Sequence, residues 1–476
     1  MLGRAGRRFC HTETVRDGRA SGSSARGVGR GVNRALLAWH MDCQHAGSPD
    51  PGSQDETTSP RGPPTTMSTR FDSLITRLRS AWKPVKQPTA PRAYRCQCER
   101  PVFFRNSECL ACKTPLGYEP ERAQVMPLKP GATEGTWQLW HDAAAPQRLY
   151  RRCGNFDTAS GCNWLVPVAA ETPALCAACR LNRTIPDLTV VEHQALWRRI
   201  ETAKRRLVSQ LLALNLPVKS KVGEDPEHGL CFDFLASPPD GPRVMTGHAD
   251  GVITLNVEEA DDAARERIRA AMREPYRTLL GHFRHEIGHY YWDRLVRDTG
   301  WLAPFRELFG DEQQDYAAAL KANYEQGPPA DWPQRFVSAY ASMHPWEDWA
   351  ETWAHYLHMV DTVDTALSFG IDADDVELDV EPWGADALWR PDDPGAASFL
   401  GFLNAWVELT AVLNEMSRSM GQHDFYPFVM PRPAVAKLQF IHLVVNGALA
   451  ATRTAAATQP VAAAPVATAA AATPAP

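Results

Sequence analysis

The sequence lacks a long apolar run, a strong net charge and an internal repeat. Because no stretch of about eighteen apolar residues occurs, we expect no transmembrane helix. Arg7-Arg8 is not followed by an apolar segment of the length that a secretory signal needs, so we expect a cytoplasmic protein. The formal net charge of −6 over 476 residues gives no global reason to expect nucleic acid or a membrane as a partner.

The overall composition is that of a globular protein with a sizeable core, since 44% of the residues are apolar and 9% are aromatic. The two ends depart from this composition. Residues 1–66 are rich in Gly, Arg, Ser, Asp and Pro, which predicts disorder, and Met67 is an alternative translation start. Residues 67–93 are interpreted as a short basic helix over 71–82 and a linker. Residues 449–476 consist mostly of Ala, Pro and Thr, which predicts a flexible low-complexity tail.

The stretch His285-Glu-Ile-Gly-His289 fits the His-Glu-x-x-His signature, in which a helix presents two imidazoles to zinc. Residues four apart share one helix face, so both histidines can reach one metal from the same side. Glu286 lies about 100 degrees round the helix from His285, close enough to the metal to take a proton from its bound water. Gly288 lowers helix propensity and is better explained by close packing. The alternative is a buried amphipathic helix with two chance histidines, whose apolar face would be Leu279, Leu280, Phe283, Ile287, Tyr290 and Tyr291.

The segments around this motif predict a small sheet and further helices. Apolar spacing predicts a helix over 195–214, and the runs 229–235 and 251–256 are typical of strands, with a hairpin-type turn at Asp250-Gly251. The strand over 251–256 is either an exposed edge that pairs with an extended peptide or an ordinary core strand. Pro275 fits the first turn of the metal helix. Two polar residues on the metal-facing side of that helix are expected to be hydrogen-bonding neighbours, His282 and Asp293.

A catalytic zinc has three protein ligands and one open position, so a third ligand must come from another segment. Pro345 fits the start of a helix on which Glu347 and Glu351 lie four residues apart. We predict that Glu347 is the third ligand and that Glu351 accepts a hydrogen bond from a ligand imidazole, and the reverse assignment is the alternative. His344 is a lesser candidate for the ligand. Tyr340 is either a core aromatic residue or a catalytic donor to the oxyanion.

Eight of the 11 cysteines lie between Cys96 and Cys179, mostly in close pairs. Without a signal peptide, such pairs favour metal binding over disulfides. We predict two structural zinc sites, because four thiolates leave no open position for a substrate, and pairing across the two sets is the alternative. The first set is Cys96, Cys98, Cys109 and Cys112, and the second is Cys153, Cys162, Cys176 and Cys179. The remaining three cysteines are expected to be free thiols: Cys10, Cys43 and Cys231.

The histidine motif, together with the stretch from Tyr340 to Glu347-Asp-Trp-Ala-Glu351, resembles the gluzincin metallopeptidases. The resemblance is greatest to the anthrax lethal-factor-like group, in which a tyrosine precedes a Glu-x-x-Ala-Glu helix whose first glutamate binds zinc. From about Tyr94 to Gly447 the chain is similar to a bacterial family of zinc-binding metallopeptidases with an N-terminal zinc-ribbon region. This resemblance implies a fold and a reaction type, but no substrate. Four segments carry it: Cys96–Tyr118, Gly281–Tyr291, His344–Tyr356 and Leu413–Met430.

We therefore expect an α+β protein in which zinc-ribbon modules over 94–185 precede a mostly helical zincin-type domain with a small sheet over 190–448. Helices over 396–420 and 433–448 would cover that domain. The expected function is zinc-dependent hydrolysis of peptide bonds in a protein or peptide substrate. The expected cofactors are one catalytic zinc ion and one or two structural zinc ions.

In this mechanism Glu286 is the general base on the zinc-bound water and then passes the proton to the leaving amine. The rival hypothesis is a zinc-ribbon adaptor that binds a protein or nucleic acid, with the zincin domain catalytically idle. A combined hypothesis is that the ribbons hold a protein that the zincin domain cuts. Four arginines give the first ribbon some positive charge: Arg92, Arg95, Arg100 and Arg105.

Overall fold

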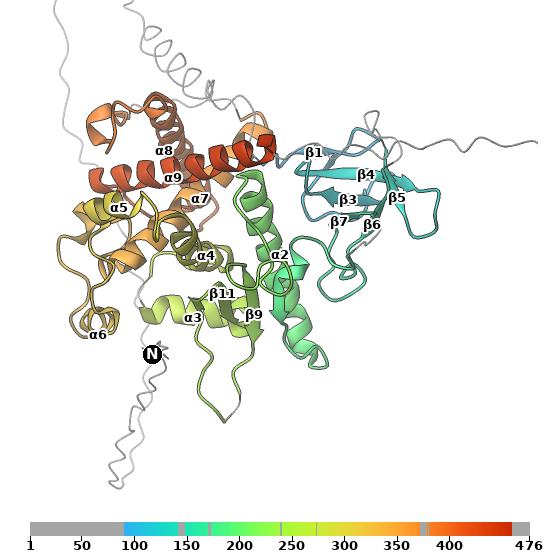
Figure 1. The fold of residues 1–476 in the computed structure, drawn as a ribbon, viewed down its shortest axis with the longest axis horizontal. Coiled ribbons are helices and arrows are strands. Elements are labelled where there is room, and N and C mark those ends of the chain that lie inside the picture. Colours follow the sequence, from blue (N-terminus) through green and yellow to red (C-terminus); the bar gives the residue numbers. More distant parts are fainter. Residues whose placement is uncertain are drawn as a thin grey trace, which may run out of the picture. The chain divides into compact units, whose positions relative to one another are not determined.

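Figure 1 shows the fold as a computed structural model, which describes residues 90–458 except 141–147, 170–172, 239, 273, 372–377 and 379. The described residues form eight α-helices and eleven strands, so the prediction of an α+β protein is confirmed. The predictions for residues 1–66, for a start at Met67, for the helix over 71–82 and for the thiols of Cys10 and Cys43 lie outside the described residues.

The ribbon region contains two antiparallel sheets. β1 (Tyr94–Arg95) pairs with β2 (Pro101–Val102) and ends directly before the first cysteine. Tyr118 and Trp164 are buried with ring centroids 4.7 Å apart and form part of the core of this region. The second sheet has five strands in chain order, namely β3 (Leu116–Glu119), β4 (Gln124–Pro130), β5 (Trp137–Leu139), β6 (Tyr150–Arg152) and β7 (Leu165–Pro167).

A mixed four-stranded sheet has the order β10-β11-β9-β8. Asp250 and Gly251 have φ angles of 49° and 74°, as a two-residue hairpin turn between β10 and β11 requires. This hairpin adds β10 outside β11, so the idea that 251–256 is the exposed edge is wrong and the core-strand alternative is confirmed. β8, β9 and β11 are parallel, and β10 is antiparallel to β11. The strands are β8 (Asn182–Thr184), β9 (Cys231–Leu235), β10 (Gly247–Ala249) and β11 (Val252–Asn256).

The helices bring distant parts of the chain together, and α4 packs against both α2 and α7. α4 begins at Leu279 because Thr278 caps it, with its Oγ1 accepting a hydrogen bond from the N–H of Gly281 at 3.0 Å. The prediction that Pro275 lies in the first turn is therefore wrong. The helices are α2 (Val191–Ala213), α3 (Asp262–Met272), α4 (Leu279–Leu295), α5 (Leu302–Phe309), α6 (Tyr316–Gln326), α7 (Pro345–Ser368), α8 (Ala396–Ser419) and α9 (Arg432–Thr458).

The two C-terminal helices differ in part from expectation. α9 continues to Thr458, into the segment predicted as a flexible tail, because the Ala-rich sequence there has high helix propensity. Within the described residues, α8 alone is long and apolar enough to cross a membrane. In the most apolar 18-residue segment of α8, 44% of the segment is buried inside the protein. Core helices of soluble proteins can have the same length and apolar composition. The absence of a membrane partner therefore stays a prediction.

Candidate metal centres

The contact between α4 and α7 brings the histidine motif and the glutamate helix together. Gly288 lies at this contact, where an added β-carbon would be 3.0 Å from the Cα of Ala350. The indole Nε1 of Trp349 donates a hydrogen bond to the carbonyl oxygen of Gly288 at 2.8 Å. Helix backbones can approach this closely only where a side chain is missing. The explanation of Gly288 by close packing is confirmed.

Three side-chain atoms from these helices face a common point. Nε2 of His285 lies 3.2 Å from Nε2 of His289. Oε2 of Glu347 lies 3.0 Å from the first nitrogen and 3.5 Å from the second. Burial would raise the pKa of Glu347, but the nearby charges of His289 and His285 lower it well below its ordinary range. An ionised carboxylate and two imidazoles are therefore gathered at one place.

The geometry of these atoms fits a zinc ion. Tetrahedral zinc with bonds of about 2.0–2.1 Å separates its ligand atoms by about 3.3–3.4 Å, close to the three distances above. Within the described part of the chain, Oε2 of Glu347 is buried without a well-formed hydrogen bond. A buried charged atom of this kind is unfavourable unless a cation is its partner. Two histidines and one carboxylate are also a known ligand set of catalytic zinc.

Glu351 lies on the other side of the His285 ring. Its Oε1 is 2.7 Å from Nδ1 of His285, and its Oε2 accepts a hydrogen bond from Oγ of Ser338 at 2.6 Å. Burial would raise the pKa of Glu351, but the hydrogen bond and charge of His285 outweigh burial and lower it to about 2. An ionised carboxylate at Nδ1 holds a proton on that nitrogen and leaves the lone pair of Nε2 free for a metal.

Glu286 is buried beside the three candidate ligands and forms an ion pair within its own helix. Its Oε1 lies 3.2 Å from Nε2 of His282. Burial would raise the pKa of Glu286, but the hydrogen bond and charge of His282 lower it. The expectation of a hydrogen-bonding neighbour is thus met by His282, whereas Asp293 pairs with Arg297 at 2.5 Å.

Two tyrosines approach the same site. The ring of Tyr340 lies with its centroid 5.9 Å from that of His285, so its position is compatible with either predicted role. Tyr316, which sequence reasoning missed, donates a hydrogen bond to Oε1 of Glu347 at 2.8 Å from the start of α6. His344 is not part of the cluster, because its Nδ1 caps α7 and its Nε2 lies 3.2 Å from the carbonyl oxygen of Gln314.

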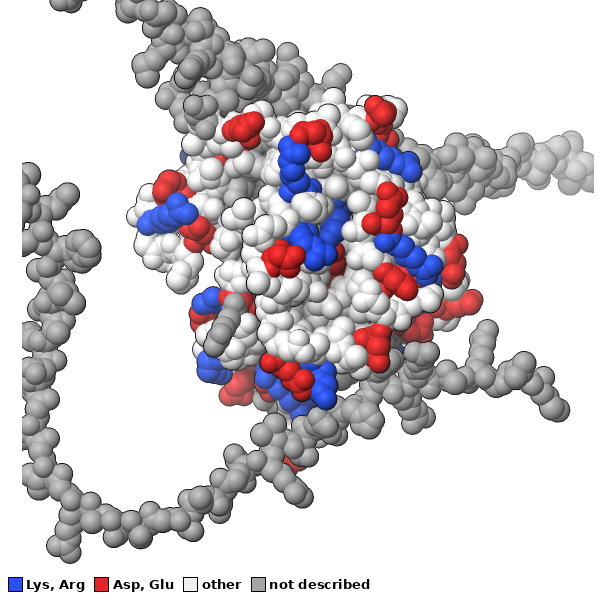
Figure 2. Space-filling model, turned by 90° about the vertical axis from the view of Figure 1, so that its left-hand side faces the viewer, with Lys and Arg blue, Asp and Glu red and all other residues white. Residues whose placement is uncertain are grey.

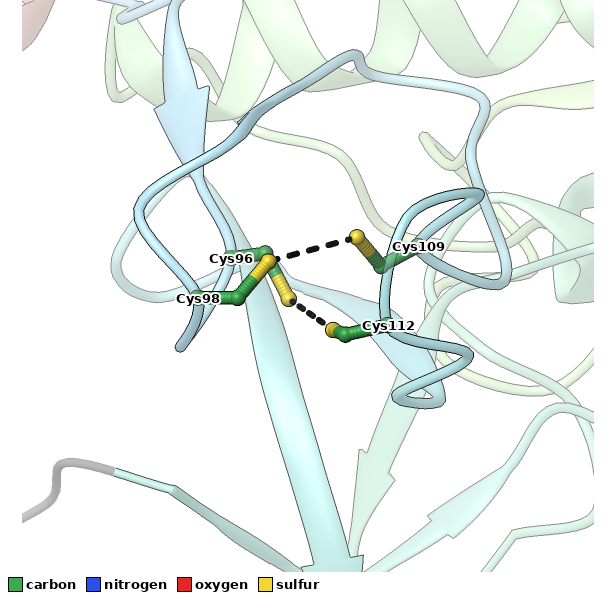
Figure 3. Close-up of side chains that lie close together, drawn as sticks. All are labelled: Cys96, Cys98, Cys109 and Cys112. Carbon is green, nitrogen blue, oxygen red and sulfur yellow. Dashed lines mark hydrogen bonds between the residues drawn. The ribbon is translucent and has the colours of Figure 1, made fainter.

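The first cysteine set converges from two loops, as Figure 3 shows. The sulfur atoms of Cys96 and Cys112 lie 3.5 Å apart, and those of Cys98 and Cys109 lie 3.8 Å apart. Four thiolates at about 2.3 Å from a tetrahedral zinc would be about 3.8 Å apart. Cys112 is exposed to solvent, so this site lies at the surface.

The second set is Cys153, Cys162, Cys176 and Cys179, and it is buried throughout. The sulfur atoms of Cys162 and Cys176 are 3.7 Å apart. Sγ of Cys179 lies 3.8 Å from Oε2 of Glu201 on α2. Glu201 also forms an ion pair with Lys204, whose Nζ lies 2.6 Å from its Oε1. The two sets are separate, so pairing across them does not occur. Among the described residues no cysteine forms a disulfide, and Cys231 is a buried free thiol in β9.

On the face drawn in Figure 2, basic and acidic side chains are intermixed, and there is no large patch of one charge. The positive charge attributed to the first ribbon is also smaller than expected. Arg92 is 3% exposed, and its Nε donates to Oδ1 of Asp361 on α7 at 2.9 Å. Only three of the four arginines therefore remain on the surface, namely Arg95, Arg100 and Arg105.

Comparison with known proteins agrees with this arrangement. Residues 193–444 match the family described as "Putative zinc-binding metallo-peptidase", and residues 93–190 match a zinc-ribbon domain. Uncharacterized proteins of Mycobacterium bovis and Mycobacterium tuberculosis are 42% identical over 357 residues, which is 75% of this chain and 95% of each relative. No solved structure matches the chain. The chain therefore belongs to this zinc-binding metallo-peptidase family and carries a zinc-ribbon domain before the peptidase region.

Proposed function

We propose that the protein is a zinc-dependent peptidase of the gluzincin type, which hydrolyses peptide bonds with Glu286 as the general base. The observation that carries the proposal is the triangle of His285 Nε2, His289 Nε2 and Glu347 Oε2, whose separations are 3.0, 3.2 and 3.5 Å. Glu286 lies on the same helix as both histidines but outside this triangle, which leaves one of its carboxylate oxygens available for proton transfer.

Bound zinc supplies Lewis acidity, which lowers the pKa of a water ligand and polarises the scissile carbonyl. Glu286 takes a proton from the attacking water and passes it to the leaving amine. Its lowered pKa keeps it ionised at neutral pH, as a base must be before the reaction. Glu351 orients His285 through the hydrogen bond to Nδ1. Tyr340 donates a hydrogen bond to the oxyanion as it forms.

A peptide substrate is supported by the outer edge of the sheet, which lies beside the site. β10 is the outer strand, and an extended peptide can pair with such an edge. His248 on β10 has its ring centroid 6.4 Å from that of His289. A peptide bound along β10 would therefore pass next to the candidate ligands.

We further propose that each cysteine set holds a structural zinc ion and that the ribbons help to hold a protein substrate or partner. A cytoplasmic location fits the eight thiols of these sets, because reducing compartments keep cysteines available for metal. Neither a membrane nor nucleic acid is part of this proposal.

The test is cleavage of a peptide library, prepared by digesting a bacterial lysate, by the zinc-loaded protein. Mass spectrometry of new N-termini should detect cleavage by the wild type and by the exposed control Glu415→Gln. Glu286→Gln should retain zinc and lose cleavage, because an amide cannot act as the base. Cleavage by Glu286→Gln at the wild-type rate would contradict the proposed mechanism. Absence of cleavage by a fully zinc-loaded wild type would favour the adaptor hypothesis.

A further inference from the structure

A series of close polar contacts leads from the sheet to Glu286: a hydrogen bond between Glu259 and His282, and then an ion pair between His282 and Glu286. His282 lies one helical turn before Glu286 on α4, with its Nε2 3.2 Å from Oε1 of that glutamate. Its other ring nitrogen, Nδ1, lies 2.6 Å from Oε2 of Glu259. Glu259 belongs to the 3-10 helix Val257–Ala260, which directly follows β11. Because both ring nitrogens face carboxylate oxygens, both carry hydrogen and donate.

Glu259 is itself held in place. Its Oε1 accepts a hydrogen bond from Oγ1 of Thr246 at 2.5 Å, and its Oε2 accepts one from Nη2 of Arg277 at 3.3 Å. The residues at the two ends of this series, Glu259 and Glu286, are each 5% exposed. His282 is therefore fixed between two buried groups, and its position is set by the sheet as well as by α4.

We propose that His282 is a positioning residue for the general base: anchored by Glu259, it binds Oε1 of Glu286 and leaves Oε2 to accept the proton of the attacking water. This inference rests on the proposed function. A glutamate side chain has several rotamers, and a base is effective only where its free oxygen meets the reacting proton. His282 keeps both of its hydrogens throughout, and Glu286 alone gains and then loses a proton.

A purely structural role for His282 is the competing explanation. When His282 is replaced, Glu259 keeps Thr246 and Arg277 as partners. α4 also keeps its packing against α2 and α7. We therefore expect His282 variants to fold and to retain zinc, so that the effect on the base can be measured separately.

The kinetic test compares His282→Ala, Glu259→Gln and the exposed control His423→Ala on the library peptide that the wild type cleaves fastest. Replacing either His282 or Glu259 should lower kcat by about 10- to 100-fold, which is the usual effect of losing a supporting polar contact. KM and zinc content should stay the same, and added imidazole should restore part of the rate of His282→Ala. An unchanged kcat, or a fall in rate that follows a loss of zinc, would overturn the inference.

A crystal structure of zinc-loaded His282→Ala gives a second readout that does not depend on hydrolysis. We expect the Glu286 carboxylate to leave its wild-type position or to lose order, while it stays in place in His423→Ala. A Glu286 carboxylate that keeps its position in His282→Ala would overturn the inference. If the wild type cleaves no peptide, the proposed function fails, and the crystal structure still decides whether His282 positions Glu286.

Discussion

At the scale of single residues, the site depends on which nitrogen of His285 meets which carboxylate. Nε2 faces Glu347 at 3.0 Å, whereas Nδ1 faces Glu351 at 2.7 Å. The two glutamates lie one turn apart on α7 and thus approach opposite sides of one ring. A carboxylate at Nδ1 selects the tautomer whose Nε2 can bind metal. The two glutamates should therefore have unequal effects on zinc affinity.

Glu347→Gln removes a charged ligand atom and should abolish zinc binding at this site. Glu351→Gln removes only the partner of a ligand and should weaken zinc binding by about 10- to 100-fold. Titration of zinc against a competing chelator measures both effects, with Glu415→Gln as the exposed control. The opposite order of the two effects would give the ligand role to Glu351.

Local spacing explains which site residues could be predicted from the sequence. His285 and His289 are four residues apart on one helix, so their meeting needs no knowledge of the fold. Tyr316 reaches Glu347 from α6, and no spacing rule connects two residues on separate helices. Glu259 is also outside the reach of such rules, because it meets His282 only after the sheet and α4 have packed.

At the scale of secondary-structure elements, the distance between α4 and α7 sets the distance between the candidate ligands. Two of the candidate ligands lie on α4 and one lies on α7, and Gly288 lies where these two helices meet. Besides the Cα of Ala350, an added β-carbon would meet the Cβ of Trp353 at 3.3 Å. A larger side chain must therefore move one helix away from the other.

Gly288→Ala should lower both the melting temperature and the affinity of this site for zinc. Overpacking a buried contact lowers the stability of the fold by about 1–3 kcal/mol. The higher helix propensity of alanine restores roughly 1 kcal/mol, so the net effect is a loss of stability. Calorimetry and zinc titration measure the two effects. Gly300→Ala is the control, because a β-carbon there meets no atom of the described residues within 4 Å. Unchanged zinc affinity in Gly288→Ala would contradict the account.

A buried ion cluster joins α2, α4, α7 and the segment before β1. Asp361 on α7 accepts hydrogen bonds from Arg92, from Arg206 on α2 and from Arg284 on α4. Burial would raise the pKa of Asp361, but the charges of the three arginines lower it far below its ordinary value. Arg284 directly precedes His285, so this cluster also supports α4, the helix that carries two of the candidate ligands.

Asp361→Asn should lower the melting temperature at pH 7, because breaking a buried ion pair costs about 3–5 kcal/mol. A lowered pKa means that the ionised carboxylate stabilises the fold above its unfolded pKa of about 3.9. This stabilisation is lost as the pH falls below about 4 toward the folded pKa. The difference in melting temperature between wild type and Asp361→Asn should therefore shrink in that range. A difference that grows as the pH falls would contradict the assignment.

Element order could be predicted better than element edges. The strand over 251–256 was expected from its apolar sequence, but β10 consists of Gly247, His248 and Ala249, which show no strand pattern. Pro275 favours a start of α4 that is too early in the sequence, because the cap formed by Thr278 determines where the helix begins. Pairing across the sheet and capping geometry depend on neighbours that spacing does not reveal.

At the scale of the whole molecule, the ribbon and peptidase regions share structural elements. β8 lies three residues after Cys179 and belongs to the sheet of the peptidase region. Glu201 on α2 lies against the same cysteine. The second cysteine set is therefore tied to the peptidase fold, whereas the first set lies at the surface through Cys112.

This difference predicts the order in which a chelator removes zinc. The site with exposed Cys112 should lose its zinc faster than the second set, in which each cysteine is at most 2% exposed. Zinc release followed with a colorimetric chelator should show a fast phase that Cys96→Ser removes. Cys176→Ser should remove a slow phase and also lower the melting temperature, because that site supports α2 and β8. A fast phase that persists in Cys96→Ser would contradict this order.

The proposed peptidase activity depends most directly on a metal ion bound between α4 and α7. Anomalous diffraction at the zinc edge, from crystals of the zinc-loaded protein, tests this claim. We predict a peak about 2.0–2.2 Å from Nε2 of His285, Nε2 of His289 and an oxygen of Glu347, and none there in His285→Ala. A wild-type map with no peak at this position, or with a peak bound by Glu351 in place of Glu347, would contradict the account.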